Sequence, residues 1–117
     1  MMPDIGDIIE IVRDIPKKNL RAGTRGAVVH CHGNDFYEIE FTDKDGETLD
    51  FLALNAINFV VVWRAKNRRW IPIAEQTSAL VAALPDDAAR QVLDFALILS
   101  LQTYQSSSFN NYEKIAA

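Results

Sequence analysis

The spacing of apolar residues changes once along this chain, and this change constrains the fold more than any other feature of the sequence. Up to about Trp63, apolar and polar residues alternate with a period of two, which is typical of β-strands with one buried face. From Ala74 onward, apolar residues recur every three or four positions, which is typical of α-helices. The sequence therefore predicts an α+β protein with a β-rich first part and a helical second part.

Five short strands are predicted in the first part, because β-branched and aromatic residues are enriched there. They cover residues 5–13, 27–32, 36–42, 47–53 and 57–63. A long loop with Pro16 separates the first two strands, and Gly33-Asn34 and Asp45-Gly46 mark two tight turns. Closing such a strip of strands removes its exposed edges, so we expect a five-stranded SH3-like β-barrel.

Alternation on the third strand predicts which of its faces enters the core of this barrel. Tyr37, Ile39 and Phe41 share that face. On the first strand, one face carries Ile5, Ile9 and Ile11. Between the first and second strands, Gly23 and Gly26 are expected to supply a positive φ or a close approach of two backbones.

The predicted domain organisation has four parts. Residues 1–63 form the barrel, and residues 64–73 are a basic linker. Residues 74–105 form a C-terminal α-helical hairpin, whose first helix ends at Pro85. Residues 106–117 are expected to be a flexible or docked tail, because their polar, serine-rich start has little power to form a core.

Composition excludes several classes of protein. The formal net charge of −4 argues against a protein dominated by nucleic-acid binding, which needs a positive field. The single cysteine cannot form an internal disulfide, so we expect a reducing compartment and a cytoplasmic protein. No apolar run approaches the roughly 20 residues of a membrane span, and no membrane association is expected.

One cluster suggests metal or nucleophilic chemistry. His30 and His32 would share a strand face, with Cys31 pointing to the opposite side. Two histidines leave a metal short of ligands, although Glu38 or Glu40 could come from the neighbouring strand. We expect two half-exposed histidines and one buried thiol, with no metal, no cofactor and no catalytic residue. The protein is therefore predicted not to be an enzyme.

The most distinctive surface feature is a basic run between two tryptophans. Its aromatic and basic members are Trp63, Arg64, Lys66, Arg68, Arg69 and Trp70. This segment and the basic first loop could bind RNA or DNA through stacking and charge. Alternatively, these residues are structural. Trp63 would then fill the end of the barrel, and Trp70 would pack the helices against it. The cations would face water or pair with the acidic hairpin.

The second predicted helix carries more apolar faces than a small barrel can cover. The excess residues are expected to bind a protein partner or a second copy of the chain, as in a homodimer. These partner-binding residues are Leu93, Phe95, Leu97 and Ile98.

The first 63 residues resemble a known family. The motif residues that carry the resemblance are Gly6-Asp7, Pro16, Leu20, Gly23, Gly26, Val28-Val29, Tyr37, Glu38, Phe41, Asp45-Gly46 and Leu54. Over residues 5–63 they resemble a family of short bacterial proteins, common in cyanobacteria, that carry a domain of unknown function. The resemblance implies an SH3-like barrel and assigns no chemistry.

Residues 75–101 resemble a second small bacterial family with an L-P-x6-V-L-x-F motif. The matching residues are Glu75-Gln76, Leu84-Pro85, Gln91-Val92-Leu93-Asp94-Phe95 and Leu99. This resemblance implies a helical hairpin and an antitoxin-like partner. Taken together, the sequence predicts a non-catalytic protein-binding or regulatory module, antitoxin-like or accessory. The alternative is a nucleic-acid-binding module.

Overall fold

The chain forms two compact units, Met1–Leu80 and Val81–Ala117. A computed structural model describes the backbone of residues 2–116 and the side chains of residues 2–105. The first unit is β-rich and the second is helical, so the predicted α+β class is confirmed. No helix in the described part of the chain is long and apolar enough to cross a lipid bilayer.

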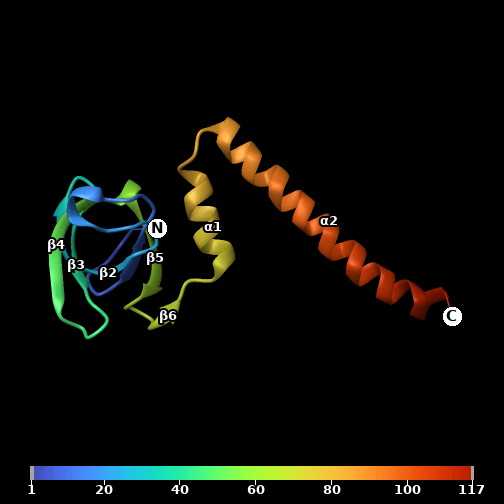
Figure 1. The fold of residues 1–117 in the computed structure, drawn as a ribbon, viewed down its shortest axis with the longest axis horizontal. Coiled ribbons are helices and arrows are strands. Elements are labelled where there is room, and N and C mark those ends of the chain that lie inside the picture. The colour runs from blue at the N-terminus through green and yellow to red at the C-terminus, as the bar shows by residue number, and fades with distance from the viewer. Residues whose placement is uncertain (1, 117) are drawn as a thin grey trace. The chain divides into compact units, whose positions relative to one another are not determined.

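Six antiparallel strands form a single curved sheet in the first unit (Figure 1). They are β1 (Ile8–Ile11), β2 (Arg25–Gly33), β3 (Phe36–Thr42), β4 (Thr48–Asn55), β5 (Phe59–Arg64) and β6 (Arg69–Trp70). Their order across the sheet is β4-β3-β2-β1-β5-β6. Two 3₁₀ turns, η1 (Pro16–Lys18) and η2 (Ala56–Asn58), interrupt the strands.

The predicted closed barrel of five strands is wrong in two respects. The sheet is open, with β4 at one edge and β6 at the other. The sixth strand lies in residues 64–73, which were predicted to be a linker. There the chain reverses through a turn in which Arg68 has a φ of 53°, and Trp70 then pairs with Trp63. This strand could not be predicted from composition, because the charged residues of the segment are not typical of strands.

The core lies on the concave side of the sheet. Ile9, Ile11, Ile39 and Phe41 are fully buried, and Tyr37 is nearly so, which confirms the predicted face of β3. These side chains form one cluster with neighbours from β2 and β5. Removal of this apolar surface from water is the main stabilising term of such a domain.

The first strand is shorter than predicted. Ile5 is 60% exposed, although it was expected to lie on the same strand face as Ile9 and Ile11, which are buried. Gly6 has a φ of +92°, so the chain turns there and the strand begins only at Ile8. The period-two pattern continues through this turn in the sequence, but the strand geometry does not.

The long loop between β1 and β2 contributes to the core. Leu20 is buried in the apolar cluster and pairs with Ile15 across the base of the loop. The loop also reaches the far edge of the sheet, because Lys18 Nζ lies 3.3 Å from Asp50 Oδ2 on β4. It thus covers part of the concave side that an open sheet would leave exposed.

Two helices follow the sheet. Helix α1 (Ile73–Ala82) spans the boundary of the two units, and α2 (Asp86–Ala116) follows Pro85, as predicted. The backbone of α2 continues through most of the segment that was predicted to be a tail. The predicted docking of that tail's side chains lies outside the described residues.

The two loop glycines have different roles, and both match the expectation. Gly23 has a φ of +92°, a conformation that L residues rarely adopt. Gly26 is required by close packing, because a Cβ there would lie 2.6 Å from Ile39 Cγ2 and 2.9 Å from Glu40 O. Strands β2 and β3 therefore approach each other closely only because position 26 has no side chain.

We predict that Gly26→Ala lowers the free energy of unfolding by about 1–3 kcal/mol, because the added methyl overpacks the core. Urea unfolding followed by circular dichroism measures this change. Ala53→Ser is the matched control, since it also adds one non-hydrogen atom but on an exposed side of β4. It should change the stability by about 0.5 kcal/mol or less. Equal stability of Gly26→Ala and the parent would contradict the close packing.

Candidate functional site

The β5–β6 hairpin brings the two tryptophans of the basic segment together. Trp63 pairs with Trp70, and Arg64 pairs with Arg69. Paired residues of antiparallel strands lie on the same face of a sheet, so the two tryptophan side chains share a face of the hairpin. Trp63 is partly buried, whereas Trp70 is 56% exposed.

Exposed cations accompany Trp70 in the β5–β6 hairpin. The side chains of Lys66, Arg68 and Arg69 are exposed, and they form no ion pair within the described part of the chain. The guanidinium carbon of Arg25 lies 5.0 Å from the Trp70 ring centroid, within the range of a cation–π contact. We call these residues, Arg25, Lys66, Arg68, Arg69 and Trp70, the Trp70 surface.

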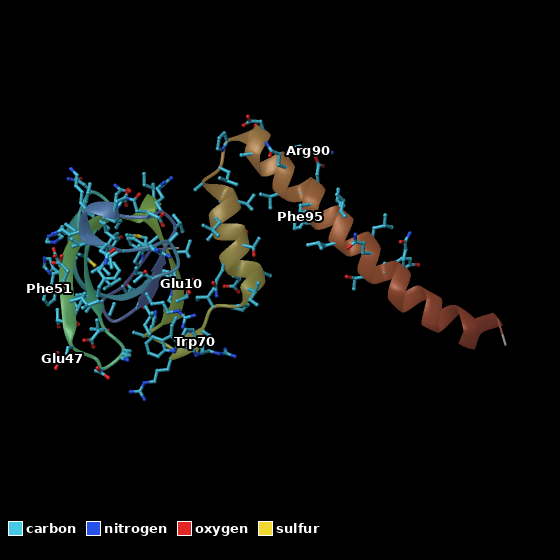
Figure 2. The ribbon with its side chains drawn as sticks, in the orientation of Figure 1. Glu10, Glu47, Phe51, Trp70, Arg90 and Phe95 are labelled. Atoms are coloured by element: carbon cyan, nitrogen blue, oxygen red, sulfur yellow. The ribbon has the colours of Figure 1, made fainter. Side chains whose placement is uncertain are left out.

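Arg25 was missed as a partner of Trp70, because the sequence placed it only in the basic loop. Its Nε donates a hydrogen bond to Glu10 Oε1 at 2.9 Å, which holds the guanidinium above the sheet. Figure 2 shows Glu10 and Trp70 among the side chains of this unit. Arg25 is the first residue of β2, and Glu10 is its partner in the register of β1 and β2. Only knowledge of that register could have predicted the contact.

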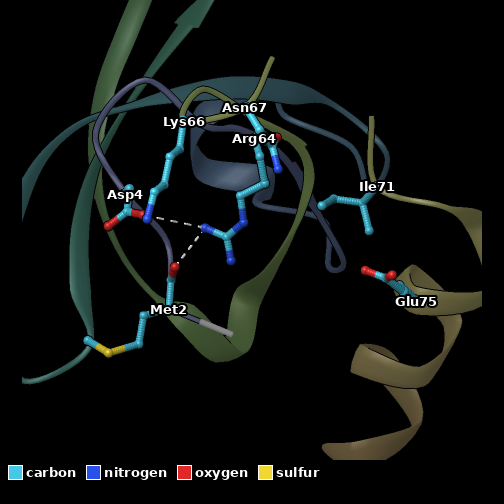
Figure 3. Close-up of a pocket in the computed structure, with 7 residues that line it drawn as sticks. All are labelled: Met2, Asp4, Arg64, Lys66, Asn67, Ile71 and Glu75. Atoms are coloured by element: carbon cyan, nitrogen blue, oxygen red, sulfur yellow. Dashed lines mark hydrogen bonds and ion pairs between the residues drawn. The ribbon is translucent and has the colours of Figure 1, made fainter. Parts of the chain in front are cut away.

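A shallow pocket lies beside the β5–β6 turn (Figure 3). It is lined by Met2, Asp4, Arg64, Lys66, Asn67, Ile71 and Glu75. Two acidic and two basic side chains meet there, so their charges offset one another. This pocket therefore offers no net charge that would select a charged ligand.

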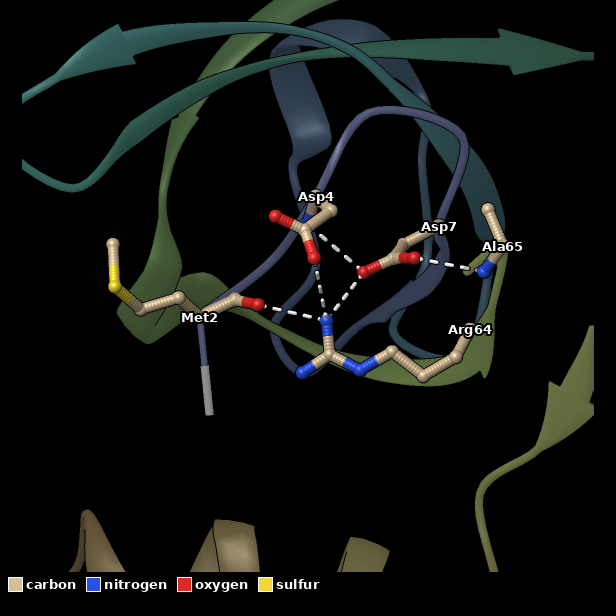
Figure 4. A network of polar contacts seen from close by, with 5 residues as sticks. All are labelled: Met2, Asp4, Asp7, Arg64 and Ala65. Carbon is tan, nitrogen blue, oxygen red and sulfur yellow. Dashed lines mark hydrogen bonds and ion pairs between the residues drawn. The ribbon is translucent and has the colours of Figure 1, made fainter. Parts of the chain in front are cut away.

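Arg64 has a different role from the other cations. It donates hydrogen bonds from Nη1 to Asp7 Oδ2 at 2.6 Å and to Met2 O at 2.7 Å (Figure 4). The Asp7 side chain is fully buried and also accepts from the backbone N–H groups of Asp4 and Ala65, each at 2.9 Å. Only 13% of the Arg64 side chain is exposed. The structure thus separates Arg64 from the Trp70 surface.

We predict that Arg64→Ala lowers the free energy of unfolding by about 3–5 kcal/mol, because it leaves the buried Asp7 carboxylate without its ionic partner. Lys66→Ala removes an exposed cation two residues away and should change stability by about 0.5 kcal/mol or less. Chemical denaturation of both variants measures the difference. Similar midpoints for the two variants would contradict a structural role for Arg64.

The predicted partner-binding residues of α2 are all exposed, but they do not share one face. Between 48% and 62% of Leu93, Phe95, Leu97 and Ile98 is accessible. Successive helical residues are about 100° apart, so Leu93 and Leu97 lie on one side and Phe95 and Ile98 on the other. Leu101 and Tyr104 extend the first side. Helix α2 therefore presents two apolar stripes.

The histidine cluster differs from its prediction at the thiol. Cys31 is exposed, not buried, because β2 is irregular on both sides of it, between Val28 and His30 and again before Gly33. His30 and His32 contact edge to face, with ring centroids 4.8 Å apart. Glu38 does reach this cluster, and its Oε1 lies 2.7 Å from His32 Nε2.

No group of three or more His, Cys, Asp or Glu side chains within the described residues could hold a metal ion. Tyr37 lies beside this cluster on β3, and burial raises the pKa of its phenol, with Cys31 adding to the shift. A phenol with a raised pKa keeps its proton at neutral pH, so Tyr37 is a core residue in this structure and not a poised base.

The geometry defines a small α+β protein with an open antiparallel sheet and two exposed surfaces. Residues 5–61 match the model of a family described as a domain of unknown function (DUF4926). This match covers β1 to the middle of β5 and leaves out β6 and both helices. No curated protein and no solved structure matches the chain.

Proposed function

We propose that this protein is a non-catalytic module that binds other protein chains through α2. In this proposal the curved sheet is an SH3-like bacterial scaffold, and α1 and α2 form a helical hairpin. The module acts in the cytoplasm as an antitoxin-like or accessory partner. The single observation that supports the proposal most is the exposure of large apolar side chains along α2.

The apolar stripes of α2 expose more large hydrophobic side chains together than is usual on the surface of a monomer. Seven exposed large hydrophobic residues fall between positions 93 and 104: Leu93, Phe95, Leu97, Ile98, Leu99, Leu101 and Tyr104. Burial of one such side chain contributes about 1.5–3 kcal/mol. Exposed apolar stripes of this kind are typical of a protein interface.

A second copy of α2 is the simplest partner for these stripes. The helix has 31 residues and is about 46 Å long, which allows several turns of contact. Two stripes on opposite sides favour a bundle, in which each helix contacts more than one neighbour. The charged residues of the first turns of α2 end at Asp94, which pairs with Arg90 at 3.0 Å. The apolar stripes follow this charged part of the helix.

We predict that Phe95→Asp weakens self-association of the full chain at least tenfold, because burying an unpaired carboxylate in the interface is costly. Sedimentation velocity over a range of concentrations measures the effect. Gln91→Asp is the control, since it adds the same charge to an exposed polar position near the start of α2. A parent that remains monomeric at all concentrations, and that captures no protein in a pull-down, would refute the proposal.

Nucleic-acid binding is the second candidate function, and the Trp70 surface supports it. An exposed indole in the same hairpin as three cations that form no ion pair among the described residues suits stacking on a base while the cations contact phosphates. The charges of the whole chain oppose this function, since the formal net charge is −4. Because the binding would rest on contacts between these cations and phosphates, it would weaken as the salt concentration rises.

We predict for this second function that the full chain binds a fluorescent single-stranded oligonucleotide at low salt, and that Arg69→Glu weakens binding at least fivefold. Fluorescence anisotropy at several salt concentrations measures it. Arg90→Glu is the control for charge, because it makes the same change on α2. No binding of the parent at low salt would exclude the function.

A further inference from the structure

The outer face of β3 and β4 exposes apolar side chains at an edge of the sheet. Phe51 is 49% exposed, Leu49 is 60% exposed, and Phe36 on β3 is 43% exposed. Figure 2 shows Phe51 on the outer side of β4. Single exposed hydrophobics need no explanation, but three on two paired strands form a patch. We call this patch, with Glu38, Glu40 and Ala53 between its members, the β3–β4 face.

Acidic side chains are interleaved with the apolar ones. Glu40 pairs in register with Phe51, and Glu38 pairs with Ala53, so both carboxylates lie on the same outer face. Thr48 Oγ1 donates a hydrogen bond to Glu40 Oε2 at 2.7 Å, which holds that carboxylate in place. About a quarter of the Glu38 side chain is exposed, and its Oε1 lies 2.7 Å from His32 Nε2. A long cationic side chain would therefore approach its other carboxylate oxygen, beside the small Ala53.

The adjoining β3–β4 turn adds to the negative charge. Asp43, Asp45 and Glu47 are in or beside this turn, and Lys44 is the single cation among them. A charged partner is selected by complementarity, so the surface favours lysine and arginine over aspartate and glutamate.

Strand β4 also has a free edge. It is the last strand of the sheet, so its outer backbone groups have no strand partner in the described part of the chain. The N–H of Phe51 donates to Asp50 Oδ1 at 2.8 Å, and Asp50 pairs with Lys18. A charged side chain on an edge strand is a known protection against pairing with other chains. An incoming strand can replace it, as in proteins that bind peptides by strand addition.

We propose that the β3–β4 face binds an extended, basic peptide segment that carries both apolar residues and lysine or arginine on one of its faces. The segment lies along β4, and its apolar side chains contact Leu49 and Phe51. Its cations reach Glu38 and Glu40. Both kinds of side chain must stand at every second position of the segment, because alternate residues of a strand share a face and the contacted side chains lie on one face of the sheet. This inference extends the proposed protein-binding function to a second surface and uses no residue of α2.

The test is binding of a fluorescent eight-residue peptide to the full chain, followed by anisotropy. The peptide has valine and lysine in turn at its odd positions and serine at its even positions. We expect saturable binding at least tenfold tighter than that of two comparison peptides. One has glutamate in place of lysine. The other has the same composition but carries its lysines at even positions, so that valine and lysine point to opposite faces. Higher salt should weaken binding, because exposed charges are screened.

Variants locate the site. Phe51→Ser should weaken binding at least tenfold, and Glu38→Gln at least threefold. Ile73→Ser and Glu75→Gln are matched controls at exposed positions of α1, and both should bind as the parent does. Circular dichroism confirms that each variant is folded, which is expected because Phe51 is half exposed.

Three outcomes would overturn the inference: equal binding of the peptide with valine and lysine on opposite faces, unchanged binding by Phe51→Ser, or self-association that Phe51→Ser abolishes. The last outcome would make a second copy the occupant. Phe95→Asp separates the two proposals, because it should retain peptide binding while it disrupts association through α2. Loss of the peptide interaction alone would leave the function of α2 intact.

Discussion

The buried pair of Asp7 and Arg64 is the contact on which the arrangement of the sheet depends. Asp7 precedes β1 and Arg64 ends β5, so the pair joins two segments that are far apart in sequence. The carboxylate also receives the N–H of Ala65, where the chain leaves β5 for the turn toward β6. Desolvation of a carboxylate is costly, and this site compensates with three hydrogen bonds. The pair therefore sets where β5 ends and where the basic hairpin begins.

The openness of the sheet gives the protein two edges, and each is protected differently. At β4, the carboxylate of Asp50 satisfies a backbone N–H that would otherwise be free. At β6, the edge strand has only two residues and carries a charged side chain, and short charged edges resist pairing with other chains. The loop that carries Leu20 covers the concave side between them. Together these features explain how a sheet that does not close can still bury a core.

The spacing of apolar residues, together with the positions of glycine and proline, predicted the parts of the fold that depend on neighbouring residues. The core face of β3 with Ile39 and Phe41, the position of Pro85 between the helices, and the close approach at Gly26 all follow from neighbouring residues. The sixth strand does not, because its two residues pair only through a tertiary contact with β5. The family match ends at residue 61 and supports only the first part of the resemblance, that to a domain of unknown function.

The candidate site was harder to predict than the fold, and the reason is register. Arg64 was grouped with the other cations because sequence proximity does not reveal that its guanidinium faces Asp7. Arg25 was not grouped with Trp70, although the two are in contact. Cys31 was expected to be buried by strict alternation, but the bulges in β2 shift the faces along that strand. Each error comes from a contact or irregularity that is absent from the local pattern.

The sequence of α2 has a consequence for the selectivity of any helix that packs against it. No charged residue occurs between Asp94 and Glu113. In paired helices, charges flanking the apolar seam decide whether the chains run parallel or antiparallel and which partner is accepted. With none available over that stretch, orientation and choice of partner depend on the shapes of leucine, isoleucine and aromatic side chains and on uncharged polar groups. Such a helix tolerates several alignments of nearly equal energy, as promiscuous binding surfaces do.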